Sequence, residues 1–210
     1  MYVAVLHGVP VAMAGRDDGA GRTWRYWLAT VLLVSGPLPT GWFAGEQVNV
    51  LFAFMTPLFV HFVLEIRRRS LSPSSLVSSG GTRPSLLREL IFPQSLGLGL
   101  LLLGLIVRWF LWRNLPLQPV LLAALLYYSL WSLAYLLSFD QRVSSVAWVV
   151  SFALMLAVTV GIPLASGQSP RLGKLSIASF QPIGLWIALL LVGYLATVTG
   201  SWLRLNRLRT

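Results

Sequence analysis

The chain has 210 residues, of which 56% are hydrophobic and only 10% are charged. Soluble globular proteins carry about 25% charged residues, so this composition excludes an ordinary soluble domain. The formal net charge of +10 does not indicate nucleic-acid binding, because the basic residues stand at the ends of apolar runs rather than on one polar surface. The chain has no cysteine, which excludes disulfides, thiolate metal sites and a cysteine nucleophile.

Apolar stretches fill most of the sequence. A helix needs roughly 20 apolar residues to span a membrane, and six stretches of about this length predict an all-α, polytopic integral membrane protein. The predicted spans are 24–43, 48–66, 91–112, 120–137, 145–164 and 182–203. They form one six-helix transmembrane domain, 24–204, between an N-terminal tail, 1–23, and a C-terminal tail, 205–210.

Prolines and short polar segments divide the first two spans. Pro37 and Pro39 are expected to bend or end the first helix, because proline lacks an N–H donor. A very short hairpin, 44–47, leads into the second span. That span contains Pro57 near its centre and ends at the arginine triplet 67–69, which is costly to place within a bilayer.

The distribution of basic residues predicts the orientation of the spans. One side has only Arg113, Arg171 and Lys174 in its connections, and Arg108 lies inside a span near that side, where its side chain is expected to snorkel to lipid headgroups. The positive-inside rule makes the other side cytoplasmic, so both termini are predicted to be cytoplasmic. The basic residues of that side are Arg16, Arg22, Arg25, Arg67, Arg68, Arg69, Arg83, Arg88, Arg142, Arg204, Arg207 and Arg209.

Few polar groups of the predicted spans suggest chemistry. All acidic residues fall in loops or at span ends, whereas ion-coupled transporters place carboxylates inside the bundle. His61 and Glu65 lie four residues apart and share a helix face. They form either a local polar pair or an intramembrane site that contacts substrate or binds a regulatory proton. The sequence has no zinc, phosphate-loop or nucleophile motif. We therefore expect no enzyme activity, metal or cofactor.

Small residues recur at four-residue spacing in the fifth span, at Ala153, Ala157 and Gly161. Such a stripe lets two helix backbones approach closely. We expect it to pack against another helix, either within the chain or across a homodimer interface.

The longest polar connection predicted on the cytoplasmic side, 67–89, is flanked by a pattern that resembles a known family. Glu65–Leu71 ends the second span with an acidic residue and arginines, and Ser85–Leu90 continues as a leucine-rich segment. With six spans and cytoplasmic termini, this pattern resembles the membrane subunit of type-2 ABC exporters. The resemblance implies a permease energised by a separate ATPase subunit that docks on this loop. Arg83 and Arg88 are the expected docking contacts.

Two other functions fit the sequence. An accessory or assembly subunit of a respiratory, photosynthetic or envelope-biogenesis complex is favoured by the lack of polar residues inside the spans. A six-span substrate-binding subunit of a vitamin uptake system has a similar size and topology. In each case we expect the chain to lie in the bilayer of a prokaryotic cytoplasmic membrane, with other protein subunits as partners and without nucleic acid.

Overall fold

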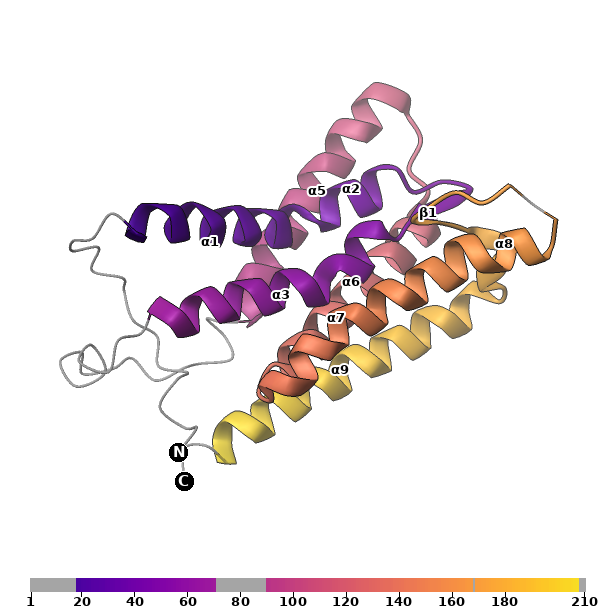
Figure 1. The fold of residues 1–210 in the computed structure, drawn as a ribbon. Coiled ribbons are helices and arrows are strands. Elements are labelled where there is room, and N and C mark those ends of the chain that lie inside the picture. Colours follow the sequence, from indigo (N-terminus) through magenta and orange to yellow (C-terminus); the bar gives the residue numbers. More distant parts are fainter. Residues whose placement is uncertain (1–17, 71–89, 168, 208–210) are drawn as a thin grey trace.

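A computed structural model of the chain describes residues 18–70, 90–167 and 169–207. In this part the chain is mostly helical, and its helices run back and forth between two ends of the molecule (Figure 1). The helices are α1 (Asp18–Ser35), α2 (Pro37–Trp42), α3 (Leu51–Ser70), α5 (Phe92–Trp112), α6 (Leu117–Leu137), α7 (Gln141–Leu156), the π-helical turn η3 (Ala157–Gly161), α8 (Ile162–Ala165), the 3-10 turn η4 (Ile177–Phe180) and α9 (Ile183–Arg207). Two short strands, β1 (Gln47–Asn49) and β2 (Lys174–Ser176), complete the fold.

The expectation of a helical membrane protein is confirmed in its coarser form. In the described ranges, four helical segments are long and apolar enough to cross a membrane, namely Phe92–Trp112, Leu117–Leu137, Arg142–Ala165 and Ile183–Leu205. α3 contains only a shorter apolar segment, Leu51–Leu64. The other two spans and the cytoplasmic position of the termini therefore stay predictions.

The helices differ in extent from several of the predicted spans. α1 begins at Asp18 and α9 ends at Arg207, so both helices extend into the predicted tails. Hydropathy marks only the apolar part of a helix, whereas backbone hydrogen bonds continue the helix into polar sequence. The second span was expected to begin at Val48, yet that residue lies in β1. The break at Pro37 is confirmed, because α1 ends at Ser35 and α2 begins at this proline.

α6 forms the centre of the bundle and packs against α3, α9 and α2. Its buried face carries large aromatic side chains, of which Trp131 is only 2% exposed. The Trp131 ring stacks on Tyr128 at 6.3 Å between centroids and meets Tyr127 edge to face at 6.0 Å. These rings fill the space between α6 and the N-terminal helices, so the middle of the bundle is packed rather than hollow.

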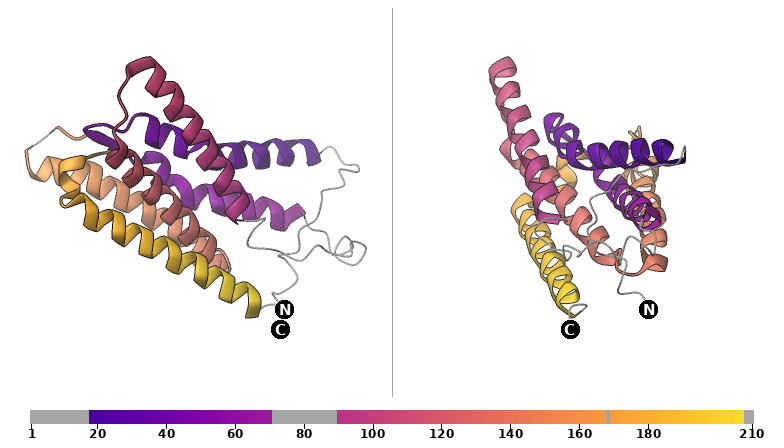
Figure 2. Two further views of the ribbon diagram at one scale, coloured as in Figure 1. Left: turned by 180° about the vertical axis from the view of Figure 1, so that it is seen from behind. Right: turned by 90° about the vertical axis from the view of Figure 1, so that its left-hand side faces the viewer.

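α5 approaches the N-terminal helices through glycines. A Cβ added at Gly97 would lie 2.7 Å from the Val34 carbonyl oxygen, and one added at Gly104 would collide with Leu38. Because a glycine has no side chain, the two backbones approach within contact distance here. The opposite side of α5 is exposed and apolar, and Figure 2 shows this helix leaning away from the rest of the bundle.

The two strands pair antiparallel and join loops far apart in sequence. Val48 stands opposite Leu175, and Asn49 stands opposite Lys174. Gly173, which precedes β2, has a positive φ of 70°, and a Cβ there would lie 2.8 Å from that of Leu51, so only glycine fits this position. We call this end of the molecule the ribbon end. The sequence predicted an all-α chain and missed the ribbon, because pairing across more than a hundred residues leaves no local periodicity.

Candidate functional site

The helices α5, α6 and α9 meet at a polar cluster inside the bundle. Gln94 of α5 is buried, and its Nε2 donates a hydrogen bond of 3.1 Å to Ser132 Oγ of α6. The Tyr194 hydroxyl of α9 donates a bond of 2.9 Å to Gln94 Oε1. One amide therefore links three helices, which is a strong restraint where competing water is scarce.

A second tyrosine hydroxyl belongs to the same region. Ser132 donates to the Tyr128 carbonyl oxygen at 2.9 Å, and these two residues lie one helical turn apart on one face of α6. The Tyr128 hydroxyl is buried and has no hydrogen-bond partner among the described residues. Among the described residues, the cluster consists of hydroxyl and amide groups that hydrogen-bond across helices and so position the helices against one another.

Other polar groups inside the bundle also bond one helix to another. The Tyr127 hydroxyl donates to the Leu33 carbonyl oxygen of α1 at 2.6 Å. Ser151 of α7 donates to the Phe54 carbonyl oxygen of α3 at 2.9 Å. Ser129 of α6 donates to a carbonyl oxygen of α9, again at 2.9 Å. Each of these bonds joins two helices within the described part of the bundle.

His61 lies on α3 and contacts α7. Its Nδ1 is 3.1 Å from the Ser144 hydroxyl, and the ring is half-buried. The side chain of Glu65 lies outside the described residues, so the expected His61–Glu65 pair stays a prediction. Sequence spacing places His61 and Glu65 on one face, but it has no signal for Ser144, which is 83 residues away.

The small-residue stripe of the fifth predicted span lies on an exposed face of α7 and η3 in the described part of the chain. Ala153, Ala157 and Gly161 are all exposed, and a Cβ added at Gly161 meets no atom within 4 Å. Packing of this stripe against another helix, within the chain or across a homodimer interface, stays a prediction. On α5, by contrast, Gly97 and Gly104 lie in close contact with the N-terminal helices.

Arg108 fills a different role from the one expected. Its Nη1 donates to the carbonyl oxygens of Trp42 and Ala44, the latter at 2.9 Å. The guanidinium thus binds backbone groups at the C-terminal end of α2, where carbonyls lack helical partners. It fastens the ribbon end of α5 to the chain segment that leads into β1.

The remaining predicted site residues, Arg83 and Arg88, lie outside the described residues. Among the described ones, no group of three or more histidine, cysteine or carboxylate side chains is arranged to hold a metal ion. Comparison with known protein families, characterised proteins and solved structures finds no match for this chain. Its own residues must therefore carry the functional argument.

The polar cluster was not predicted from the sequence. Gln94 is an amide close to the start of a long apolar run, and such a residue is a signal that was available, because polar side chains in spans usually find partners on other helices. The partners of Gln94 could not be predicted from the sequence, since Ser132 and Tyr194 lie 38 and 100 residues away.

Proposed function

We propose that the chain is a membrane-embedded subunit of a larger assembly in a prokaryotic cytoplasmic membrane, and that it serves as the permease subunit of an ABC-type transporter energised by a separate ATPase subunit. The observation that carries the proposal is the use of interior polar groups. The buried hydrogen bonds of Gln94, Ser132 and Tyr127 tie helices together. The interior polar groups of a single chain therefore serve helix packing.

The transport path then lies between chains. Polar solutes cross membranes along polar or water-filled surfaces, and the aromatic side chains of α6 fill the centre of this bundle. α9 packs mainly on α6 and leaves Leu189, Val192 and Leu195 exposed. α5 and α7 also expose most of their apolar surface. These faces provide lipid contacts and room for a second subunit.

The test is purification in a gentle detergent followed by mass spectrometry of the chains that co-purify. An ABC ATPase subunit is expected with the unchanged chain. The variant with Arg83→Glu and Arg88→Glu should insert normally and lose that subunit. Arg142→Glu is the matched control, because it reverses an exposed charge on the same predicted side, at the start of α7, and should keep it.

The proposal fails in this form if no ATPase co-purifies with the unchanged chain. If the double variant and the control retain the ATPase equally, the docking role of the loop is wrong, although the permease function stands. Insertion of each variant is checked by its yield in the membrane fraction, so that loss of the partner is not confused with loss of the protein.

A second candidate is an accessory or assembly subunit without transport activity. The fixed arrangement of the ribbon end favours it, since the β1–β2 pairing joins loops from both halves of the chain and the Arg108 bonds tie α5 to the segment that precedes β1. A permease must open alternately toward the two sides of the membrane, and these bonds oppose opening at this end. Co-purification of cofactor-bearing membrane subunits, without an ATPase, is the result expected for this candidate.

A further inference from the structure

The β1–β2 ribbon has one apolar and one polar face. Val48 is fully buried, and Leu175 packs beside it against the core. Side chains alternate between the two faces of a strand, so Gln47 and Asn49 share the other face of the ribbon with Lys174, which stands opposite Asn49. This polar face borders a hollow of about 340 Å³. The residues that line it are Phe43, Gly45, Glu46, Gln47, Asn49, Arg171 and Lys174.

Backbone and side-chain bonds hold the wall of the hollow in place. The Ile177 N–H donates to the Glu46 carbonyl oxygen at 3.0 Å, and the Lys174 N–H donates to the Arg171 carbonyl oxygen at 3.0 Å. Arg171 Nη1 also reaches across the ribbon to Gln47 Oε1 at 3.3 Å. The hollow is therefore a built feature of two loops that come from opposite halves of the chain.

The hollow combines charges of both signs. Arg171 and Lys174 supply two cations, and Glu46 supplies one carboxylate. Within the described part of the chain, no ion pair joins Glu46 to either cation, and the only side-chain bond of Arg171 is the one to Gln47. Two positive charges and one negative charge that do not form ion pairs with each other match a ligand with a phosphate at one end and an ammonium at the other.

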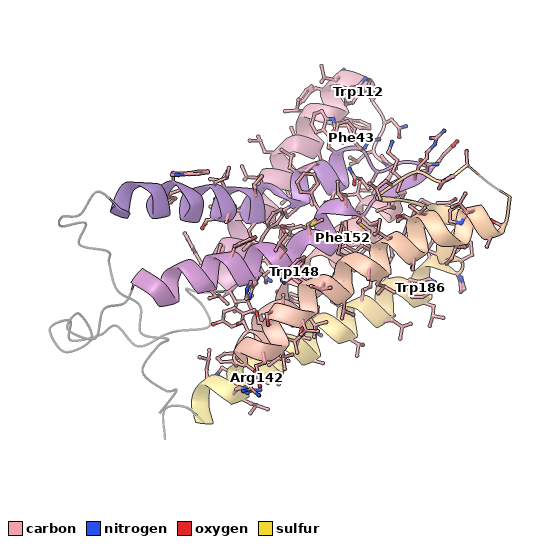
Figure 3. The ribbon with its side chains drawn as sticks, viewed as in Figure 1. Phe43, Trp112, Arg142, Trp148, Phe152 and Trp186 are labelled. Atoms are coloured by element: carbon pink, nitrogen blue, oxygen red, sulfur yellow. The ribbon has the colours of Figure 1, made fainter. Side chains whose placement is uncertain are left out.

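The position of the hollow suits a lipid headgroup. Phe43 is 68% exposed at its rim, and Trp42 meets Trp112 edge to face at the same end, near the tip of α5 (Figure 3). Exposed aromatic side chains at span ends mark the headgroup level of a membrane. A volume of about 340 Å³ lies at the lower end of the range for small-molecule sites, which fits a headgroup better than a larger solute.

We propose that the hollow at the ribbon end binds a phosphoethanolamine group, with the phosphate at Arg171 and Lys174 and the ammonium at Glu46. The group comes either from a phosphatidylethanolamine of the surrounding leaflet or from a free zwitterion. The guanidinium donates to phosphate oxygens in a fixed fork geometry, and the Glu46 carboxylate accepts hydrogen bonds from the primary ammonium. The site does not depend on the transport function proposed above.

The test uses the full chain in nanodiscs of phosphatidylcholine. Binding of free phosphoethanolamine and of free glycerol phosphate is measured by ligand-observed NMR, and retention of added phosphatidylethanolamine is measured by native mass spectrometry. Binding of free phosphoethanolamine indicates the soluble source, and selective retention of the lipid alone indicates the leaflet. If neither is seen, the proposal is wrong.

Two variants separate the two ends of the ligand. Arg171→Gln should weaken binding of both phosphate probes by up to about fivefold, the range expected for one exposed charge contact, and Lys174→Gln should act in the same direction. Glu46→Gln should weaken only the ethanolamine-bearing ligand. Arg113→Gln, at an exposed arginine of the same end outside the hollow, is the control and should change nothing.

Two results overturn the assignment. If Glu46→Gln weakens phosphoethanolamine and glycerol phosphate equally, or affects neither, the hollow does not recognise the ammonium. If Arg113→Gln lowers binding as much as Arg171→Gln, the effect comes from the general charge of this end. All substituted residues are exposed, and the thermal unfolding of each variant confirms that it is folded.

Discussion

Replacing Gly97 by alanine is expected to destabilise the bundle, whereas the same replacement at Gly99 is not. Both glycines lie inside α5 and would gain about 0.8–1 kcal/mol of helix propensity, so this contribution cancels in the comparison. A Cβ at Gly97 would lie 2.7 Å from the Val34 carbonyl oxygen and 3.3 Å from Pro37, but one at Gly99 meets nothing within 4 Å. The difference between the two variants therefore reports packing alone.

The magnitude follows from the atoms that must move. The Val34 oxygen belongs to the backbone near the end of α1, so it cannot rotate away as a side chain does, and α1 must shift against α5. Overpacking of this kind costs about 1–3 kcal/mol. With about 2–4 °C per kcal/mol for a chain of this size, the melting temperature of Gly97→Ala should lie about 2–12 °C below that of Gly99→Ala.

The assay is thermal unfolding in a mild detergent, followed by the fluorescence of the nine tryptophans. Trp131 is a suitable reporter, because it is buried in the core beside Tyr128, whose hydroxyl lies close to Gly97. Equal melting temperatures for the two variants would refute the close approach of α5 to α1. A lower melting temperature for Gly99→Ala than for Gly97→Ala would reverse the assignment of the packed face.

Three further predictions concern the polar cluster, the topology and the small-residue stripe. Gln94→Leu removes two interhelical hydrogen bonds and should lower the free energy of unfolding in detergent by about 1–2 kcal/mol. Gln118→Leu, at an exposed position of α6, is the control and should lower it by less than half as much. Equal losses would contradict the role of Gln94 in linking helices. Reporter fusions after Gln168 should be external and those after Ser79 cytoplasmic, and the opposite result at either site disproves the predicted orientation. Ala157→Leu should leave the unfolding temperature of the monomer unchanged, since Ala157 is exposed, and should lower self-association measured by cross-linking; an unchanged dimer fraction would remove the homodimer interface.

The sequence alone determined the kind of protein and most of its helices. Long apolar runs need no tertiary information to be recognised, because a bilayer imposes about 20 residues on any helix that crosses it. Pro37 marked the break between α1 and α2 for an equally local reason, the missing N–H donor. Helix ends such as Asp18 were not determined, since hydropathy does not follow a helix into polar sequence.

The tertiary structure decided which faces meet. The spacing of Ala153, Ala157 and Gly161 was a valid signal for a smooth helix surface, but it contains no information about whether another helix covers that surface. Gly97 and Gly104, which do form close contacts with the N-terminal helices, lie seven residues apart on a different helix. Choosing between the two stripes requires knowing how α5 crosses α1 and α2.

The partners in each polar site also come from segments that lie far apart in the sequence, so only the tertiary structure shows that they meet. Gln94, Ser132 and Tyr194 come together from three helices, and the hollow joins Glu46 to Arg171 through strand pairing between loops more than a hundred residues apart. Residue type shows that such groups need partners, because an unpaired polar group in an apolar environment is costly. Only the folded arrangement of the helices determines which partner each group finds.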